Sequence, residues 1–260
     1  MTKLVLGNYK AQLRALPESG RVIQAQYTDE YVVVYQAYKA SIAEWAVEHQ
    51  CFGRPDFSFN RVSWIKPNFT WMMYRCGWTE KKHQERVLAI KLRRDYWDEI
   101  LSQAVSTNYN ENQSQYETRE AWQTDLKNSG VLLQWDPDHE PFTNDKYKRR
   151  AIQLGIRPTL LKKFGRDQDC GIFEIEDVTD FVKMTKQFFF NKEDWLEDLH
   201  TPVETIFLHN LILTFLNELW NELIRTRALT PLLYTYKIRN LIAPCATMMI
   251  TVSCNQIFGQ

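Results

Sequence analysis

The chain has 260 residues, of which 44% are hydrophobic and 13% aromatic, so it can build a large buried core. Lysine plus arginine number 32, as do aspartate plus glutamate, and this balance excludes a globally basic nucleic-acid-binding surface. Five cysteines without a C-x-x-C pair argue against a disulfide framework or a cysteine-rich zinc site. The five histidines show no metal-ligand spacing. We therefore predict no metal, although a site assembled from distant residues remains open.

The first 20 residues are predicted to be a polar leader, because they end in a Pro-Glu-Ser-Gly turn and contain no apolar run of signal-peptide length. The longest apolar run, residues 206–216, is too short to span a bilayer. We expect a cytoplasmic protein that does not interact with membranes.

Strand-forming runs at 22–27 and 31–38 predict a hairpin. Ser41 and Glu44 have the spacing of a capping box, which predicts a helix over 42–49. The later expected elements are a strand at 85–92, a helix at 94–105, a loop at 106–115, a helix at 117–128, strands at 131–135 and 149–156, a short helix at 158–164, a strand at 171–176, and a helix from 177 whose inward side chains are Phe181, Met184 and Phe188.

These elements do not alternate as β-α-β units, so residues 21–203 are predicted to form one α+β domain with a mixed, mainly antiparallel sheet and interspersed helices. After residue 204 charged residues become rarer and apolar residues more frequent. Apolar spacing predicts a helix over 206–227. Residues 204–260 are therefore expected to form an atypical apolar, helical C-terminal extension.

The most informative stretch runs from Arg61 to Trp78. Pro67 suits the first position of a helix, and Gly77 suits the position just past its end, which predicts a helix over 67–76. Lys66 would then lie where unpaired backbone amides and the helix dipole favour an anion. We predict a phosphate-binding site here, with Arg61, Trp64 and Tyr74 among its ligand-contacting residues. The alternative is that Lys66 extends into solvent.

Two further groups of residues complete the predicted site. On the strand at 31–38, Gln36 and Tyr38 share one face, so they could contact a base or nicotinamide, whereas Tyr35 faces the other side and fits ordinary strand packing as well as ligand contact. At the end of the strand at 131–135, Gln134 and Asp136 are the candidate catalytic residues. Asp-Pro-Asp at 136–138 is also a plain turn signature, and for Asp136 the turn is the favoured interpretation.

Gln153 alternates with apolar neighbours on the strand at 149–156, so it points either into the site or to solvent. No glycine-rich phosphate loop or G-x-G-x-x-G motif occurs, which argues against P-loop and Rossmann sites. A serine hydrolase has no support either, since spacing assigns no His or Asp partner to a serine.

Several blocks of the chain resemble a family of domains of unknown function, number 4291, over residues 20–203. These blocks are Val34–Tyr38, Trp64–Pro67, Trp71–Arg75, Glu85–Ile90, Gln134–Pro137 and Ile152–Gly155. This resemblance implies no particular activity, because none is established for the family.

The order of blocks also resembles that of ADP-ribosyltransferase folds, without a shared motif. Such a resemblance is a weak argument for chemistry. It implies NAD as a candidate cofactor, although the residues themselves identify none. Our leading hypothesis is an enzyme acting on a nucleotide-type ligand. The alternatives are a non-enzymatic RNA- or nucleotide-binding module and a protein-interaction domain.

Overall fold

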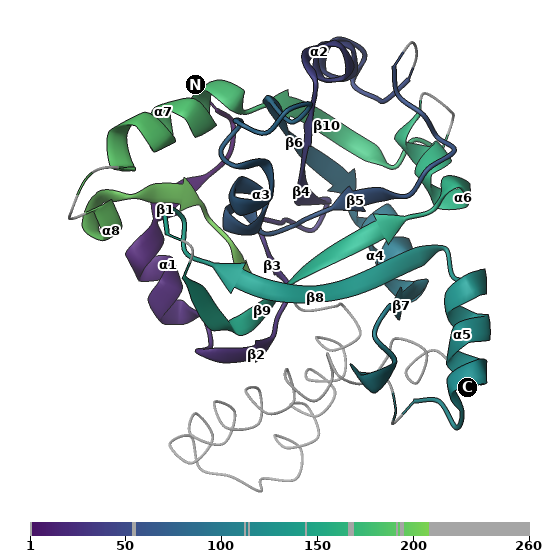
Figure 1. The fold of residues 1–260 in the computed structure, drawn as a ribbon. Helices are drawn as coiled ribbons and strands as arrows, with labels where there is room; N and C mark the ends of the chain where they lie inside the picture. The colour runs from purple at the N-terminus through teal and green to yellow at the C-terminus, as the bar shows by residue number, and fades with distance from the viewer. Residues whose placement is uncertain are drawn as a thin grey trace, which may run out of the picture.

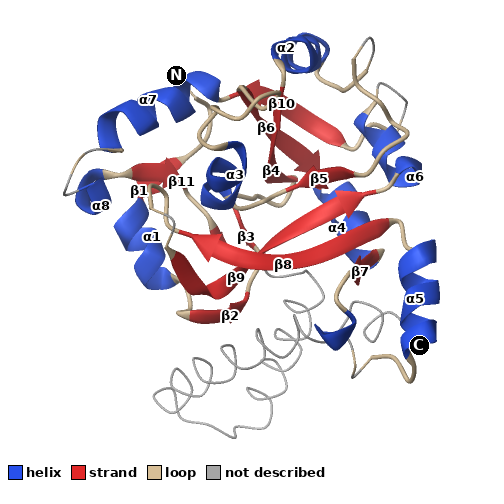
Figure 2. Ribbon diagram, viewed as in Figure 1, coloured by secondary structure: helices blue, strands red, loops and turns tan. Residues whose placement is uncertain are grey.

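The computed structural model describes residues 2–207, except for 54–55, 112, 114, 144, 166–168, 191 and 193–194 (Figure 1). Helices and strands are interspersed along the chain, and most strand pairs are antiparallel, which confirms the α+β class (Figure 2). The helix expected over 206–227 does not begin at residue 206, which belongs to a short strand, and the residues from 208 onwards lie outside the described part of the chain.

The first sheet has three antiparallel strands in the order β10-β6-β4: β4 (Tyr31–Tyr38), β6 (Arg86–Arg93) and β10 (Ile172–Asp177). One face packs against α2 (Ala40–His49) and α4 (Arg94–Ser102), and the other against α3 (Phe69–Cys76) and α7 (Thr179–Phe189). Because both faces are covered, β4 and β6 are almost continuously apolar rather than alternating.

The second sheet has five strands: β2 (Ser19–Arg21), β5 (Ser63–Ile65), β7 (Ala104–Ser106), β8 (Val131–His139) and β9 (Lys146–Ile156). The long strands β8 and β9 pair antiparallel and extend across the front of the molecule in Figure 1. Apolar side chains of this sheet, including Val131, Ile152 and Leu154, share one core with Val32 and Leu88 of the first sheet. The two sheets therefore fold as one unit.

Short elements surround these sheets. They are β1 (Leu6–Asn8) paired with β11 (His200–Pro202), β3 (Gln24–Ala25) paired with β12 (Thr205–Ile206), the helices α1 (Tyr9–Ala15), α5 (Arg119–Asn128), α6 (Pro158–Leu161) and α8 (Trp195–Asp198), and the 3-10 turns η1 (Tyr109–Glu111) and η2 (Lys162–Phe164).

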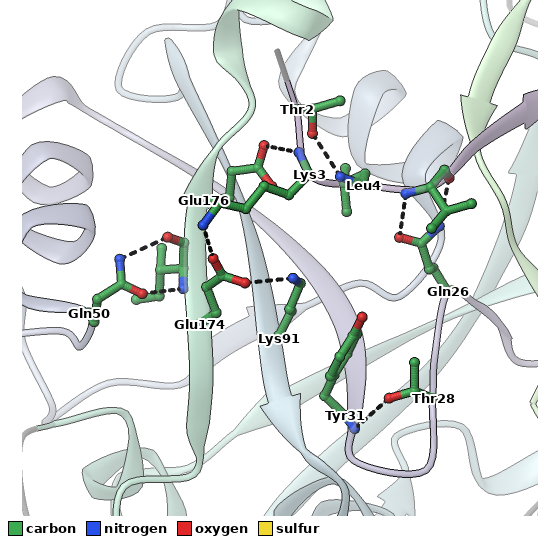
Figure 3. A network of polar contacts seen from close by, with 12 residues as sticks. Thr2, Lys3, Leu4, Gln26, Thr28, Tyr31, Gln50, Lys91, Glu174 and Glu176 are labelled. Atoms are coloured by element: carbon green, nitrogen blue, oxygen red, sulfur yellow. Dashed lines mark hydrogen bonds and ion pairs between the residues drawn. The ribbon is translucent and has the colours of Figure 1, made fainter.

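The N-terminal segment, predicted only as a polar leader, carries β1, α1 and β2. Figure 3 shows how it is held. The Gln26 side chain donates to the carbonyl of Val5 at 2.7 Å and accepts from its amide at 3.3 Å, while Lys3 contacts Glu174 of β10. Sequence reasoning missed this docking because each contact joins residues far apart along the chain.

A side chain also bonds the backbone of β10, the outer strand of the first sheet. Gln50, in the left-handed conformation at the end of α2, accepts from the amide of Ile175 at 2.8 Å and donates to its carbonyl at 3.0 Å (Figure 3). This pair of bonds holds the end of α2 against the sheet.

Several elements differ from the predictions. Strand β8 continues through Asp136-Pro137-Asp138 instead of turning there, because a register shift between Pro137 and His139 accommodates the proline. The predicted 94–105 helix ends at Ser102, and β7 follows it. The capping box at α2 was also wrong, because Ser41 donates to Asp56 instead.

The inward face of α7 was also predicted wrongly. Met184 and Phe188 are 56% and 65% exposed, while Val182 and Thr185 are buried. Phe181 is partly buried and packs against the core, as expected. The helix covers the sheet with a different stripe from the one that the larger apolar side chains suggested.

Candidate functional site

A pocket of about 740 Å³ lies where the two sheets meet, between β4, β5, α3 and the β8–β9 pair. The sheets are linked here by the backbones of Tyr35 and Lys66, which exchange hydrogen bonds of 2.7 and 3.3 Å. Most of the side chains predicted for the site line this pocket, although they come from four separate segments: Gln36, Tyr38, Arg61, Trp64, Lys66, Gln134 and Gln153.

Gln36 forms the wall between β4 and β5. It is buried, and its amide group donates to the Ser63 hydroxyl at 2.8 Å and the Trp64 carbonyl at 3.0 Å. Its oxygen accepts from the Tyr38 hydroxyl at 3.0 Å. A glutamine buried inside an apolar strand needs hydrogen-bond partners, and these three groups supply them. Because these partners belong to the protein, Gln36 shapes the pocket and holds Tyr38 and Ser63 in place.

Tyr38 contributes its hydroxyl edge rather than a stacking face. Its ring packs against Phe52 and Phe57 in the core, at centroid distances of 5.4 and 6.1 Å. Burial raises the pKa of Tyr38 to about 12, so the phenol stays protonated at neutral pH.

The opposite wall carries Gln134 and Gln153, which are cross-strand partners on β8 and β9. The Gln153 amide donates to Gln134 at 2.8 Å and to the Asp136 carboxylate at 2.6 Å. The predicted catalytic pair is therefore brought together through Gln153. Gln134 lines the pocket, whereas Asp136 lies behind and is not among the lining residues.

Lys66 lies inside the pocket wall. The residue is 4% exposed, so the alternative that its side chain extends into solvent is wrong. Among the described residues its ammonium forms no hydrogen bond or ion pair. Burial, aided by the positive charge of Arg75, lowers the pKa of Lys66 to about 8, while Asp136 partly opposes the shift.

The pocket has an excess of positive charge. Besides Lys66 it is lined by Arg61 and Arg75, both exposed, and neither forms an ion pair within the described ranges. Lys39 and Asp56 also line it, but these two pair with each other at 2.9 Å. The cationic side chains at 61, 66 and 75 are therefore available to an anionic ligand.

The loop after α3 reaches the pocket in an unusual backbone conformation. Trp78, Thr79 and His83 have φ values of 53°, 75° and 64°. A positive φ is strained for a β-branched threonine, and such strain concentrates at functional sites. His83 and Gln84 from this loop line the pocket. No residue pattern in the sequence marked the conformation of this loop.

The start of α3 differs from the predicted anion site. The helix begins at Phe69, two residues later than expected, and Asn68 caps it by accepting from the Trp71 amide at 2.7 Å. The Phe69 amide donates to the carboxyl group of Glu204 at 2.6 Å. The helix terminus does attract an acidic group, as the dipole argument predicts, but the group belongs to the chain itself. Gly77 ends the helix in the left-handed conformation, as predicted.

Glu204 provides a first test of this arrangement. Burial raises its pKa well above the usual value because it penalises the charged form, so the uncharged isostere in Glu204→Gln should fold with unchanged or higher stability at pH 7. Glu204→Ala would leave the Phe69 amide without its partner and should lower stability by about 1–3 kcal/mol. Urea denaturation of both variants checks this, and equal losses in both would contradict it.

Besides Asp136, two predicted residues lie outside the pocket. Tyr35 faces the core beneath α3, and its ring packs edge-on against Phe69 at 5.5 Å. Tyr74 is 38% exposed and stacks on His139 with ring centroids 3.6 Å apart. Sequence reasoning omitted Ser63 and Arg75 from the ligand-binding residues, although Arg75 is one turn beyond Met72 on the same helix and could have been placed by helical spacing.

A family model matches the part of the chain that builds this pocket. The domain of unknown function DUF4291 matches residues 22–207, which include β4, β5, α3, β8 and β9. The chain belongs to the DUF4291 family. No curated protein matches it. The DUF4291 region thus contains every residue that lines the pocket.

In the described part of this DUF4291 protein, no helix combines the length and apolar character needed to cross a membrane. The same residues contain no group of three or more histidine, cysteine, aspartate or glutamate side chains arranged to hold a metal ion.

Proposed function

We propose that this DUF4291 pocket binds a phosphate-bearing, nucleotide-type ligand. The observation that carries the proposal is the set of cations at Arg61, Lys66 and Arg75, which surround one pocket without protein counter-charges bound to them among the described residues. The volume of about 740 Å³ is within the range of small-molecule sites. Guanidinium groups suit phosphate because they can donate two parallel hydrogen bonds.

The pocket also offers groups that recognise the uncharged part of such a ligand. Gln134 contributes an amide whose nitrogen is a hydrogen-bond donor. Trp64 contributes indole surface beside Gly155, where a Cβ atom would come within 3.0 Å of the indole ring. Gly155 therefore leaves room for the tryptophan at the pocket wall.

The most specific form of the proposal is an ADP-ribosyltransferase-like enzyme that uses NAD. Its reaction breaks the bond between the ribose C1′ and the nicotinamide nitrogen, releases nicotinamide, and joins C1′ to an acceptor nucleophile. Gln134, with Asp136 behind it, would lie nearest the reacting ribose. Its support is the order of strands and helices, an analogy of fold rather than of residues.

Ligand binding is tested by calorimetry with ADP, ADP-ribose, NAD and inorganic phosphate. Arg61→Gln and Arg75→Gln should each weaken nucleotide binding by at least about tenfold, which corresponds to about 1.4 kcal/mol. Lys148→Gln, at an exposed position of β9, is the matched control and should bind as the wild type does. Equal affinity of all four proteins would contradict the proposal.

A non-enzymatic RNA- or nucleotide-binding module is the second candidate. It is favoured by the exposed Tyr74 ring next to Arg75, since aromatic side chains beside cations stack on bases. Release of nicotinamide from NAD separates the two: an enzyme releases it and loses this activity in Gln134→Ala, whereas a binding module gains thermal stability with the ligand and turns nothing over.

A further inference from the structure

We propose that Lys66 is a nucleophilic amine that forms an imine with the aldehyde of a phosphate-bearing sugar. This inference rests on the proposed function, because it assigns the ligand's phosphate to the pocket cations. It specifies the ligand as a sugar phosphate or nucleoside-diphosphate sugar with a free anomeric carbon, reacting in its open-chain form.

The placement of Lys66 supports this role. Its backbone is fixed by two hydrogen bonds to Tyr35, one donated and one accepted, so its Cα position is set by β4. The residue is 4% exposed and is one of those that line the pocket, so its side chain is withheld from bulk solvent. Within the described ranges no acceptor holds the ammonium, unlike Lys91, whose amine is 2.6 Å from Glu174.

Its surroundings favour the reactive form of the amine. Only a neutral lysine attacks a carbonyl, and lysines are activated by desolvation or by a neighbouring cation. Both conditions hold here, since burial and Arg75 lower the pKa of Lys66 to about 8. Lys66 is therefore neutral in about a tenth of the molecules at pH 7, whereas an ordinary lysine is neutral in less than about a thousandth of them.

The step balances without a further reagent. The Lys66 nitrogen attacks the aldehyde carbon, the carbonyl oxygen leaves as water with both amine protons, and a carbon–nitrogen double bond remains. Arg61 and Arg75 would hold the phosphate during this step, because both residues line the same pocket and guanidinium groups suit phosphate. Cyanoborohydride adds a hydride to the imine carbon and makes the link permanent.

The test uses the full chain with ribose 5-phosphate and cyanoborohydride at pH 7.5, followed by peptide mass spectrometry. We expect one pentose phosphate per chain, located at Lys66, formed at least tenfold faster than at the exposed Lys148. Ribose without phosphate should react at least tenfold more slowly at Lys66, and ADP should compete with the sugar phosphate. The rate at Lys66 should rise with pH to a midpoint near 8.

The variants separate this inference from the proposed function. Lys66→Arg keeps the charge and should bind ADP but form no adduct. Modification of Lys66 no faster than Lys148 would overturn the imine. If ADP still binds to the wild type, and binds more weakly to Arg75→Gln, the proposed phosphate site is supported even though the imine is not. A different result is rapid labelling of Lys66 that is equally fast with ribose and ribose 5-phosphate and is not slowed by ADP. That result would show a reactive lysine but would overturn the phosphate-bearing ligand.

Discussion

Lys66→Met should make the protein more stable at pH 7 while reducing its affinity for phosphate-bearing ligands. The pKa of Lys66 falls from 10.5 to about 8 on folding, so keeping its ammonium charged in the pocket wall costs roughly 3 kcal/mol at neutral pH. Methionine fills a similar volume without charge. Chemical denaturation at pH 7 should therefore show a gain on the order of 1–3 kcal/mol.

The pH dependence of this difference identifies its cause. Between pH 8 and 10.5 the unfolded chain keeps a proton on Lys66 that the folded chain has lost, so the stability of the wild type rises with pH in this window. Lys66→Met lacks this rise, and the gap between the two proteins should close by about pH 10.5. Lys148→Met, at an exposed position, should change stability by less than about 0.5 kcal/mol. A loss of stability in Lys66→Met would contradict the assignment.

Arg149→Met should destabilise the protein by about 3–5 kcal/mol, the largest loss that we expect from a single substitution outside the pocket. Arg149 and Asp138 form a buried ion pair of 2.6 Å, and the two residues are 3% and 0% exposed. Removing the guanidinium leaves a buried carboxylate whose Oδ2 atom keeps, among the described residues, a hydrogen bond from Gln24 alone, at 3.4 Å. For a domain of this size the melting temperature should fall by on the order of 10 °C.

The neighbouring residue supplies the control for this experiment. Arg150 follows Arg149 in β9 but is exposed, so Arg150→Met should melt within about 2 °C of the wild type. Combining Arg149→Met with Asp138→Asn removes the buried charge and should recover a large part of the lost stability. An equal loss in the two arginine variants would show that burial of the ion pair is not the cause.

Local patterns predicted much of the fold. The alternation along β4 placed Gln36 and Tyr38 on one face and Tyr35 on the other, as the structure has them. Gly77 set the end of α3 correctly, because its left-handed conformation is a local requirement. The strand residues of the pocket wall could be predicted in the same way, because they alternate along each strand with residues that point into the core.

The remaining features depend on contacts between distant residues. The start of α3 is decided by Asn68 and by Glu204, which lies 135 residues after Phe69, and no local pattern announces that contact. Asp136-Pro137-Asp138 has the composition of a turn, but pairing with β9 keeps it in a strand. Met184 and Phe188 are apolar yet exposed, so hydrophobicity alone misjudged which stripe of α7 is buried.

The two hydrogen bonds between Gln50 and Ile175 have a consequence for self-association. The border strand of a sheet presents unpaired amides and carbonyls on which a foreign chain can build an additional strand, the first event in many aggregation processes. In β10 one such amide and carbonyl are already engaged by a glutamine side chain. A neighbouring molecule would have to displace the Gln50 side chain from these two backbone groups before it could add a strand to the sheet.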